Sequence, residues 1–420
     1  MEYILKRIIL ENQEIISNRE LISRDYHLPK TDAILVLTGI RRSGKTHILY
    51  EIAQQFNAER ILFLDFEDER LLTLNSLASY DIIIDTYKSL FPHLEPVLFF
   101  DEIQNLPNWH LYLKRLHIQG YKIHVTGSNA HLISREIATF LKGRSIEITV
   151  RPFSFTEFLE LKKIVIQPKD QTIYPGKILH LFEEYMHFGG FPEVIKVAPT
   201  EKRIIAKNIY NLLFYKDLVA RYNKEDYLLK LVVSKIVENI TKEFSITSMA
   251  NKIISVYKTS VPTVADYFNI LPEPYLASNV YQYRVSFVQR ESKRKTYLSD
   301  NSFIFLNRVT MDSSRLFENL VFNYLLRKFD ELYYYKTNNN LEVDFFIPGP
   351  PSKILIQVTY SLQDSDSRKR EIKSLLKAME EQDMQLGFIF SWNEEEDLTF
   401  QDQRIRVIPF WKETLLSQLH

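Results

Sequence analysis

Short apolar runs alternate with longer amphipathic segments over the first 150 residues of the chain. The apolar runs are predicted to be strands, and they cover residues 33–38, 60–65, 96–101, 121–127 and 145–150. Each run is followed by polar sequence or by a segment of helical periodicity. This alternation is typical of a parallel sheet covered by helices on both faces. The pattern therefore predicts an α/β domain over residues 1–160.

The hydrophobic pattern changes twice after residue 160. Residues 161–225 are predicted to be mainly helical, and residues 226–305 to form short helices and then a hairpin. Residues 306–420 return to mixed α/β, so we predict four domains. The helices expected after residue 225 are 246–250, 261–271, 315–329 and 367–381. The strands expected there are 276–280, 282–288, 295–298, 332–336, 343–347, 354–360 and 385–391.

Composition narrows the class of protein. The 420 residues contain 53 Lys and Arg against 53 Asp and Glu, so any contact with nucleic acid must come from a local patch. The absence of cysteine excludes disulfides, thiolate metal sites and a cysteine nucleophile. No apolar run approaches the roughly 18 residues of a membrane span. We expect a cytoplasmic protein without a membrane partner.

Residues 39–46 match the phosphate-binding pattern G-x-x-x-x-G-K-[ST] in full. The motif follows a predicted strand and precedes an amphipathic run, so its backbone N–H groups can surround an anion at a helix N-terminus. Lys45 is expected to reach the β- and γ-phosphates, and the Thr46 hydroxyl to ligate Mg²⁺. The predicted nucleotide-binding residues are Gly39, Arg41, Arg42, Ser43, Gly44, Lys45, Thr46 and His47.

Two acidic residues end the third predicted strand. Asp101 and Glu102 directly follow four apolar residues. Asp101 is expected to complete the Mg²⁺ shell, and Glu102 to polarise the attacking water. Ser128 or Asn129, after the next strand, would orient the water or sense the γ-phosphate. An ordinary helix N-cap explains the same two residues equally well, and both interpretations stay open.

Together these motifs resemble a family of prokaryotic AAA-type ATPases close to the archaeal ATPases and signal-transducing NTPases. The resemblance rests on residues 39–46, 99–104, 126–129, 142–144, 151–158, 188–193, 215–218, 263–267, 341–345 and 356–358. It covers nearly the whole chain and implies ATP and Mg²⁺ as cofactors. The implied fold is a P-loop NTPase sheet with a helical lid (161–225), a winged helix (226–305) and a restriction-endonuclease-like α/β domain (306–420).

The same resemblance suggests an arginine that faces the γ-phosphate. Arg144 is the candidate and Arg135 its competitor, while a plain ion pair between Arg144 and Glu147 is the structural alternative. In related ATPases such an arginine can come from a neighbouring subunit, which would imply a homo-oligomer. Spacing alone does not establish this role.

Residues 226–305 resemble a winged helix with a candidate recognition helix at 263–270. Its hairpin is basic, with Arg290, Lys293, Arg294 and Lys295 as candidate phosphate contacts. The helix itself contains Asp266 and no Arg or Lys, whereas base-reading helices usually present cations or amides. DNA and a protein therefore both remain candidate partners.

Residues 306–420 resemble a restriction-endonuclease-like core, in which two acids and a Glu-x-Lys pair gather around a metal. Glu318 and Asp344 match the acids, but Gln357 and Thr359 replace the Glu-x-Lys pair. Lys353, Arg368 and Lys369 are the cations that could substitute. We expect no nuclease activity, and we predict an ATPase whose nucleotide state drives the C-terminal module. The alternatives are a slow nucleotide switch that docks proteins and an ATP-gated nuclease.

Overall fold

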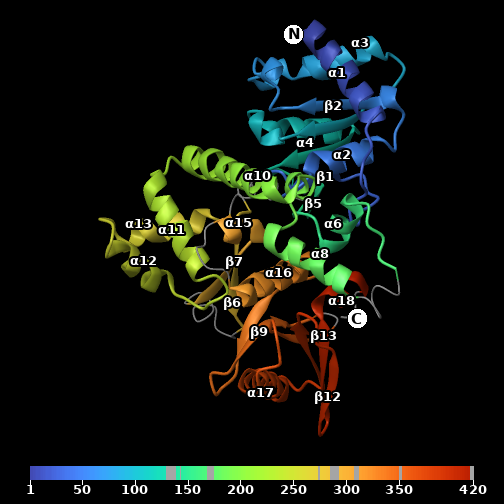
Figure 1. Cartoon of the computed structure of the whole chain (residues 1–420). Coiled ribbons are helices and arrows are strands. Elements are labelled where there is room, and N and C mark those ends of the chain that lie inside the picture. Colours follow the sequence, from blue (N-terminus) through green and yellow to red (C-terminus); the bar gives the residue numbers. More distant parts are fainter. Residues whose placement is uncertain are drawn as a thin grey trace. The chain divides into compact units, whose positions relative to one another are not determined.

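The computed structural model describes residues 1–128, 139–141, 143–167, 175–272, 275–283, 293–306, 312–349 and 352–416. The chain divides into two compact units, which are described separately (Figure 1). The first unit comprises residues 1–151 together with Tyr275. The second comprises the remainder of the chain.

A five-stranded sheet forms the centre of the first unit, in the order β2-β3-β4-β1-β5, with every neighbouring pair parallel. Its strands are β1 (Ile34–Thr38), β2 (Ile61–Asp65), β3 (Val97–Asp101), β4 (Lys122–Gly127) and β5 (Ser145–Thr149). Each predicted strand is thus confirmed to within one residue at either end. The order places β4 beside β1, so the polar residues that end β4 lie near the loop after β1.

Helices cover both faces of this sheet. One face packs on α1 (Glu2–Ser17), α3 (Asp81–Leu90) and α4 (Trp109–Ile118). The other packs on α2 (Lys45–Ala53). Alternate residues of β1 face opposite cores, since Val36 belongs to the first core and Leu37 to the second. Short 3₁₀ turns are present at Ala58–Arg60, Glu69–Leu71, Leu77–Ser79 and Ile103–Asn105.

The second unit begins with helices. They are α6 (Phe155–Leu161), α8 (Gly176–Phe188), α9 (Pro192–Ile195), α10 (Pro199–Leu212), a π-helical segment Leu213–Ala220, α11 (Asp226–Glu238), α12 (Ile246–Ile254) and α13 (Val261–Ile270). The chain turns after α8 at Gly189, whose φ is 74°. A Cβ at Gly189 would lie 1.8 Å from a carboxylate oxygen of Asp300, and the Gly190 N–H donates to that carboxylate at 2.7 Å. Only glycine fits this turn.

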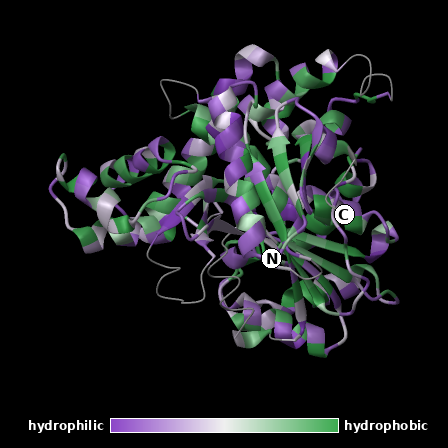
Figure 2. Cartoon of the chain, turned by 90° about the horizontal axis from the view of Figure 1, so that it is seen from below, coloured by the Kyte–Doolittle hydropathy of each residue, from purple (hydrophilic) through white to green (hydrophobic). Residues whose placement is uncertain are grey.

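A mixed eight-stranded sheet follows, in the order β12-β13-β11-β10-β9-β8-β6-β7. Its strands are β6 (Ala277–Gln282), β7 (Arg294–Leu298), β8 (Tyr333–Lys336), β9 (Glu342–Ile347), β10 (Ile354–Val358), β11 (Leu386–Ser391), β12 (Glu396–Phe400) and β13 (Gln403–Pro409). The accompanying helices are α15 (Asn301–Leu306), α16 (Ser313–Lys328), α17 (Ser365–Glu381) and α18 (Phe410–Leu416). In Figure 2 hydrophobic residues dominate many of the strands, whereas the helices carry both hydrophobic and hydrophilic residues.

The hairpin assigned to a winged helix belongs to this C-terminal sheet. β6 pairs with β7 and also, in parallel, with β8. The predicted boundary at residue 305 therefore falls inside one continuous sheet. Of the predicted strand at 282–288, Gln282 ends β6, and residues 284–288 lie outside the described residues. The winged-helix and nuclease-like assignments stay predictions.

Candidate nucleotide site

The loop from β1 to α2 is shaped by two glycines. Gly44 caps α2 with a φ of 97°, and Gly39 has a φ of 137°. A Cβ at Gly39 would lie 2.1 Å from the carbonyl oxygen of Val150. The loop therefore runs close against neighbouring backbone and enters α2 at the carboxyl end of the sheet, where free helical N–H groups favour an anion.

Lys45 lies at the start of α2 and is buried. Its ammonium donates hydrogen bonds to the carbonyl oxygens of Gly39 and Ile40 at 3.1 and 3.2 Å. It also lies 3.8 Å from a carboxylate oxygen of Glu102. The lysine is thus held inside the loop by neutral carbonyl groups, with one more distant carboxylate.

Thr46 and Asp101 meet at this edge of the sheet. The Thr46 hydroxyl donates to Asp101 Oδ2 at 2.7 Å, and the Thr126 hydroxyl donates to Asp101 Oδ1. Burial raises the pKa of Asp101, and the adjacent negative charge of Glu102 raises it further. A hydroxyl and a carboxylate are the hard oxygen ligands that Mg²⁺ prefers, so this pair fits the ion. Thr126, which no prediction named, was detectable as a polar residue ending β4.

Glu102 follows β3 with a left-handed φ of 48°. Burial alone would raise its pKa, but the positive charges of Lys45 and Arg41 outweigh burial and hold the pKa below its ordinary value. Hydrogen bonds from Gln104 and Ser128 act in the same direction. Glu102 is therefore ionised at neutral pH, as an acceptor for a water proton must be.

The remaining residues of the loop differ in exposure. Arg41 is buried and donates to Glu67 at 2.8 Å, while Arg42 is exposed with a φ of 68°. The Ser43 hydroxyl is buried and makes no hydrogen bond to any described residue. The Nε2 atom of His47 lies 3.5 Å from Nη2 of Arg19.

Sequence analysis missed Arg24, which ties the loop to the rest of the unit. Its guanidinium donates to the carbonyl oxygens of Ser43 at 2.8 Å and Arg151 at 3.0 Å. Arg24 lies outside every motif, so no local signal pointed to it.

Two candidate residues, Asn129 and Arg135, lie outside the described residues. Arg144 is exposed and lies before β5, where its carbonyl accepts the N–H of Ile34 at 2.8 Å. Because β1 and β5 are parallel, Arg144 sits at the opposite end of the sheet from the phosphate loop. The five residues of β1 separate the two by about 16 Å. A γ-phosphate contact by Arg144 within its own chain is therefore wrong, and a contact to a neighbouring subunit stays a prediction.

The nuclease-like acids surround a lysine in the second unit. Lys295 Nζ lies 2.8 Å from Glu342, 3.1 Å from Asp344 and 3.3 Å from Glu318. Lys295 is 1% exposed, so its predicted role as a phosphate-contacting cation of an exposed hairpin is wrong. The reason is that β7 is part of a sheet and directs this side chain into the interior.

Of the other residues considered around these acids, only Gln357 has a described contact with them. Gln357 accepts the Asp344 N–H at 3.4 Å and donates to Glu371. The Thr359 hydroxyl donates to the Ser361 carbonyl. Lys353 bonds the Gln382 carbonyl, Arg368 pairs with Glu396, and no described contact brings Lys369 to the cluster. Within the described residues no group of three acidic or histidine side chains is arranged to hold a metal.

The other basic residues of the hairpin are engaged differently. Lys293 pairs with Glu243 at 2.9 Å, and the Arg294 guanidinium lies 5.2 Å from the centre of the Tyr281 ring. Arg290 lies outside the described residues. On α13, Asp266 forms an ion pair with Lys224. DNA contact at this hairpin stays a prediction.

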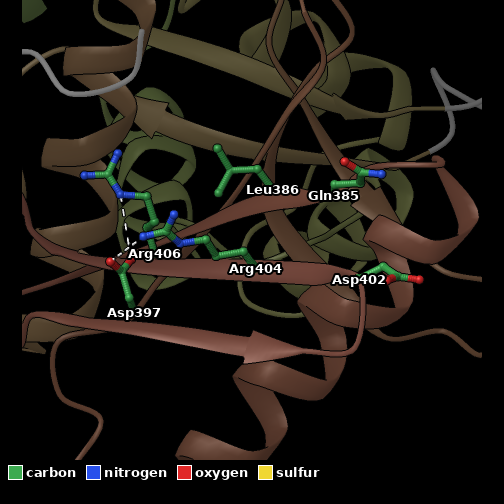
Figure 3. A pocket seen from close by; sticks show the side chains of 6 residues that line it. All are labelled: Gln385, Leu386, Asp397, Asp402, Arg404 and Arg406. Carbon is green, nitrogen blue, oxygen red and sulfur yellow. Dashed lines mark hydrogen bonds and ion pairs between the residues drawn. The ribbon is translucent and has the colours of Figure 1, made fainter.

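A hollow of about 480 Å³ is present on the C-terminal sheet, between β11 and the β12–β13 hairpin (Figure 3). It is lined by Gln385, Leu386, Asp397, Asp402, Arg404 and Arg406. Asp397 lies 2.6 Å from Arg404 and 3.9 Å from Arg406 (Figure 3). The aspartate offsets the positive charge of both arginines, so this hollow is a poor anion site.

Three family profiles match consecutive parts of the chain. Residues 31–159 match an AAA domain, residues 179–311 a domain of unknown function (DUF8612), and residues 313–412 another (DUF4143). The uncharacterized protein MJ1544 of Methanocaldococcus jannaschii is 32% identical over 435 residues, covering 98% of this chain and 95% of that protein. The chain belongs to the AAA-type ATPase family.

Two further proteins resemble this AAA-type chain. An uncharacterized protein of Haemophilus influenzae is 27% identical over 374 residues, covering 83% of this chain and 89% of its own. The solved structure of the Walker-type ATPase PABY2304 of Pyrococcus abyssi is 14% identical, with a TM-score of 0.43. That match covers 72% of this chain and 95% of the Pyrococcus chain. Among the described residues no helix is long and apolar enough to cross a membrane.

Proposed function

We propose that the chain binds ATP with Mg²⁺ and hydrolyses it at the carboxyl ends of β1 and β3. The carrying observation is that Lys45, Thr46, Asp101 and Glu102 converge there, with Thr46 and Asp101 2.7 Å apart and Lys45 and Glu102 3.8 Å apart. When bound, Mg²⁺ neutralises charge on the β- and γ-phosphates. Thr46 and Asp101 would hold the ion.

The protein residues divide the remaining work. Lys45 is expected to leave the carbonyl oxygens of Gly39 and Ile40 and to donate to phosphate oxygens, which are stronger acceptors because they are charged. Glu102 would orient the attacking water and accept its proton. The Glu102 N–H donates to the Thr126 hydroxyl at 2.9 Å, which ties this residue to Asp101 through one threonine.

Two variants separate binding from hydrolysis. Lys45→Ala should abolish nucleotide binding, because its charge acts in the ground state. Glu102→Gln should keep ATP bound and stop turnover, because that carboxylate acts on the water. Binding is measured with a fluorescent ATP analogue, and turnover by phosphate release. The controls are Lys88→Ala and Glu95→Gln, a surface ion pair of the same unit. Turnover at the wild-type rate in Glu102→Gln would remove the proposed role of that residue.

We further propose that the nucleotide state controls what the C-terminal unit binds and that this unit cuts no DNA. Lys295 supports the second point, since its ammonium lies where the acids of a nuclease would gather around a metal. A DNA or a protein partner would act through this unit. Phosphate release measured with and without duplex DNA tests whether DNA is the partner. Turnover that does not depend on DNA favours a protein partner.

A further inference from the structure

Arg41 connects the ends of two strands that are not neighbours. It belongs to the loop after β1, while its partner Glu67 follows β2, and the sheet places β4 and β3 between those strands. The guanidinium also lies 3.5 Å from the hydroxyl of Ser128, which follows β4. Arg41 therefore extends along the edge of the sheet where Glu102 follows β3.

The Arg41 guanidinium is more deeply buried than the carboxylate of Glu67 with which it pairs. Its side chain is 8% exposed, while that of Glu67 is 33% exposed. Lys45 and Arg41 are thus two buried cations from one loop, and both act electrostatically on the same carboxylate, Glu102. A triphosphate brings several negative charges to a loop of this kind.

We propose that Arg41 contacts the γ-phosphate within its own chain and that Glu67 is its partner when no γ-phosphate is bound. This inference rests on the proposed ATPase function. ATP binding moves the guanidinium from Glu67 to the γ-phosphate oxygens, and loss of phosphate returns it. The ion pair between Glu67 and Arg41 is broken when the γ-phosphate is bound and formed when it is absent. The segment after β2, which contains Glu67, therefore responds to the nucleotide state.

During hydrolysis Arg41 exchanges no proton, because a guanidinium stays protonated in proteins. The water oxygen bonds to the γ-phosphorus while the bond from that phosphorus to the β–γ bridging oxygen breaks. The bridging oxygen leaves with ADP, and the water proton passes to Glu102. Arg41 stabilises the negative charge that spreads over the γ-phosphate oxygens. A cis arginine also makes turnover independent of a neighbouring Arg144.

The test compares ADP with a non-hydrolysable ATP analogue, both by calorimetry, and measures single-turnover hydrolysis. Arg41→Ala should weaken analogue binding by about 10- to 100-fold and leave ADP binding nearly unchanged. Hydrolysis should fall by about 10³-fold, with partial recovery in Arg41→Lys. Glu67→Gln should tighten the analogue several-fold without affecting ADP, because the competing carboxylate charge is gone.

The pair Arg115 and Asp81 provides controls, since Arg115→Ala and Asp81→Asn remove an exposed ion pair between the same kinds of group in the same unit. Equal loss of ADP and analogue affinity in Arg41→Ala, or an unchanged hydrolysis rate, would overturn the inference. If Arg41→Ala fails to fold, Arg41→Lys and Glu67→Gln decide by the same ratio of affinities. Absence of hydrolysis by the wild-type protein would instead count against the ATPase function itself.

Discussion

Each of the two units buries a lysine beside one or more carboxylates, but the two lysines have different partners. Lys45 donates to two neutral carbonyl oxygens and lies 3.8 Å from Glu102. Lys295 has three carboxylates within 2.8–3.3 Å. An ammonium has three N–H donors, so Lys295 is saturated by charged acceptors whereas Lys45 can exchange carbonyls for phosphate. The first arrangement can receive an anion, whereas in the second a cation already lies among the acids.

Protonation strengthens this contrast. Burial opposes the charged form of Lys295, but the charges of the surrounding acids raise its pKa well above the ordinary value. Burial raises the pKa of Glu318 to about 7 although Lys295 acts against the shift. The positive charge of Lys295 therefore offsets part of the negative charge of the surrounding acids. The role of the cluster is to join β7, β9 and α16.

Removing the cation from the second cluster is the largest expected effect. Lys295→Met removes the cation that Asp344 and Glu318 share and should lower the free energy of unfolding by about 3–5 kcal/mol. Urea denaturation measures the loss. Lys293→Met, at a partly exposed ion pair, is the control and should cost much less. Equal losses for the two variants would show that Lys295 does not hold the cluster together.

His124 in the first unit and Glu318 in the second should change the free energy of unfolding with pH in opposite directions. Burial lowers the pKa of His124 on β4 to about 4, below its ordinary 6.5. The contribution of His124 to the free energy of unfolding is complete above pH 6.5 and is lost as the pH falls toward 4. The total loss is about 3 kcal/mol. The raised pKa of Glu318 acts the other way, since that contribution is present below pH 4.5 and lost as pH rises through 7.

Stability against pH for His124→Phe and Glu318→Gln measures these two contributions. His124→Phe should remove the loss between pH 6.5 and 4, and Glu318→Gln the loss between pH 4.5 and 7. An unchanged acid limb in His124→Phe would contradict burial of a neutral imidazole.

Mg²⁺ should distinguish the two sets of acids. ATP together with Mg²⁺ is expected to stabilise the wild-type protein by about 2.7 kcal/mol when the ligand concentration is 100 times its dissociation constant. Asp101→Asn should lose the Mg²⁺-dependent part, whereas Asp344→Asn should keep it. Thermal unfolding with ATP, with and without Mg²⁺, measures both. Loss of the Mg²⁺ effect in Asp344→Asn alone would reverse the assignment.

We expect no cleavage of DNA by the protein. Linear and supercoiled DNA should stay intact with Mg²⁺ or Mn²⁺, with or without ATP, because the Lys295 ammonium lies among the acids that would have to hold a metal. Agarose gels measure nicking. Metal-dependent nicking that survives repurification and disappears in Asp344→Ala would establish an active nuclease.

The sequence by itself determined the loop between β1 and α2 in the first unit. Residues 33–53 contain the strand, the glycines and the helix start in one stretch, and such local geometry follows from backbone preferences and the helix N-terminus. The helix Glu2–Ser17 was not predicted, although its buried residues Leu5, Ile8, Ile9 and Ile16 follow a helical spacing. The strands β12 and β13 went unpredicted.

Only the tertiary structure decided the partners of Lys295, Arg41 and Arg144. The charge pattern of residues 289–296 predicts an exposed basic hairpin. The pairing of β6 with β8 instead makes this hairpin part of a sheet in which Lys295 is buried. The contact of Arg41 with Glu67 depends on the order of four strands, and the position of Arg144 on the direction of β5. These contacts join residues far apart in the chain, and charge pattern and periodicity describe only neighbours along it.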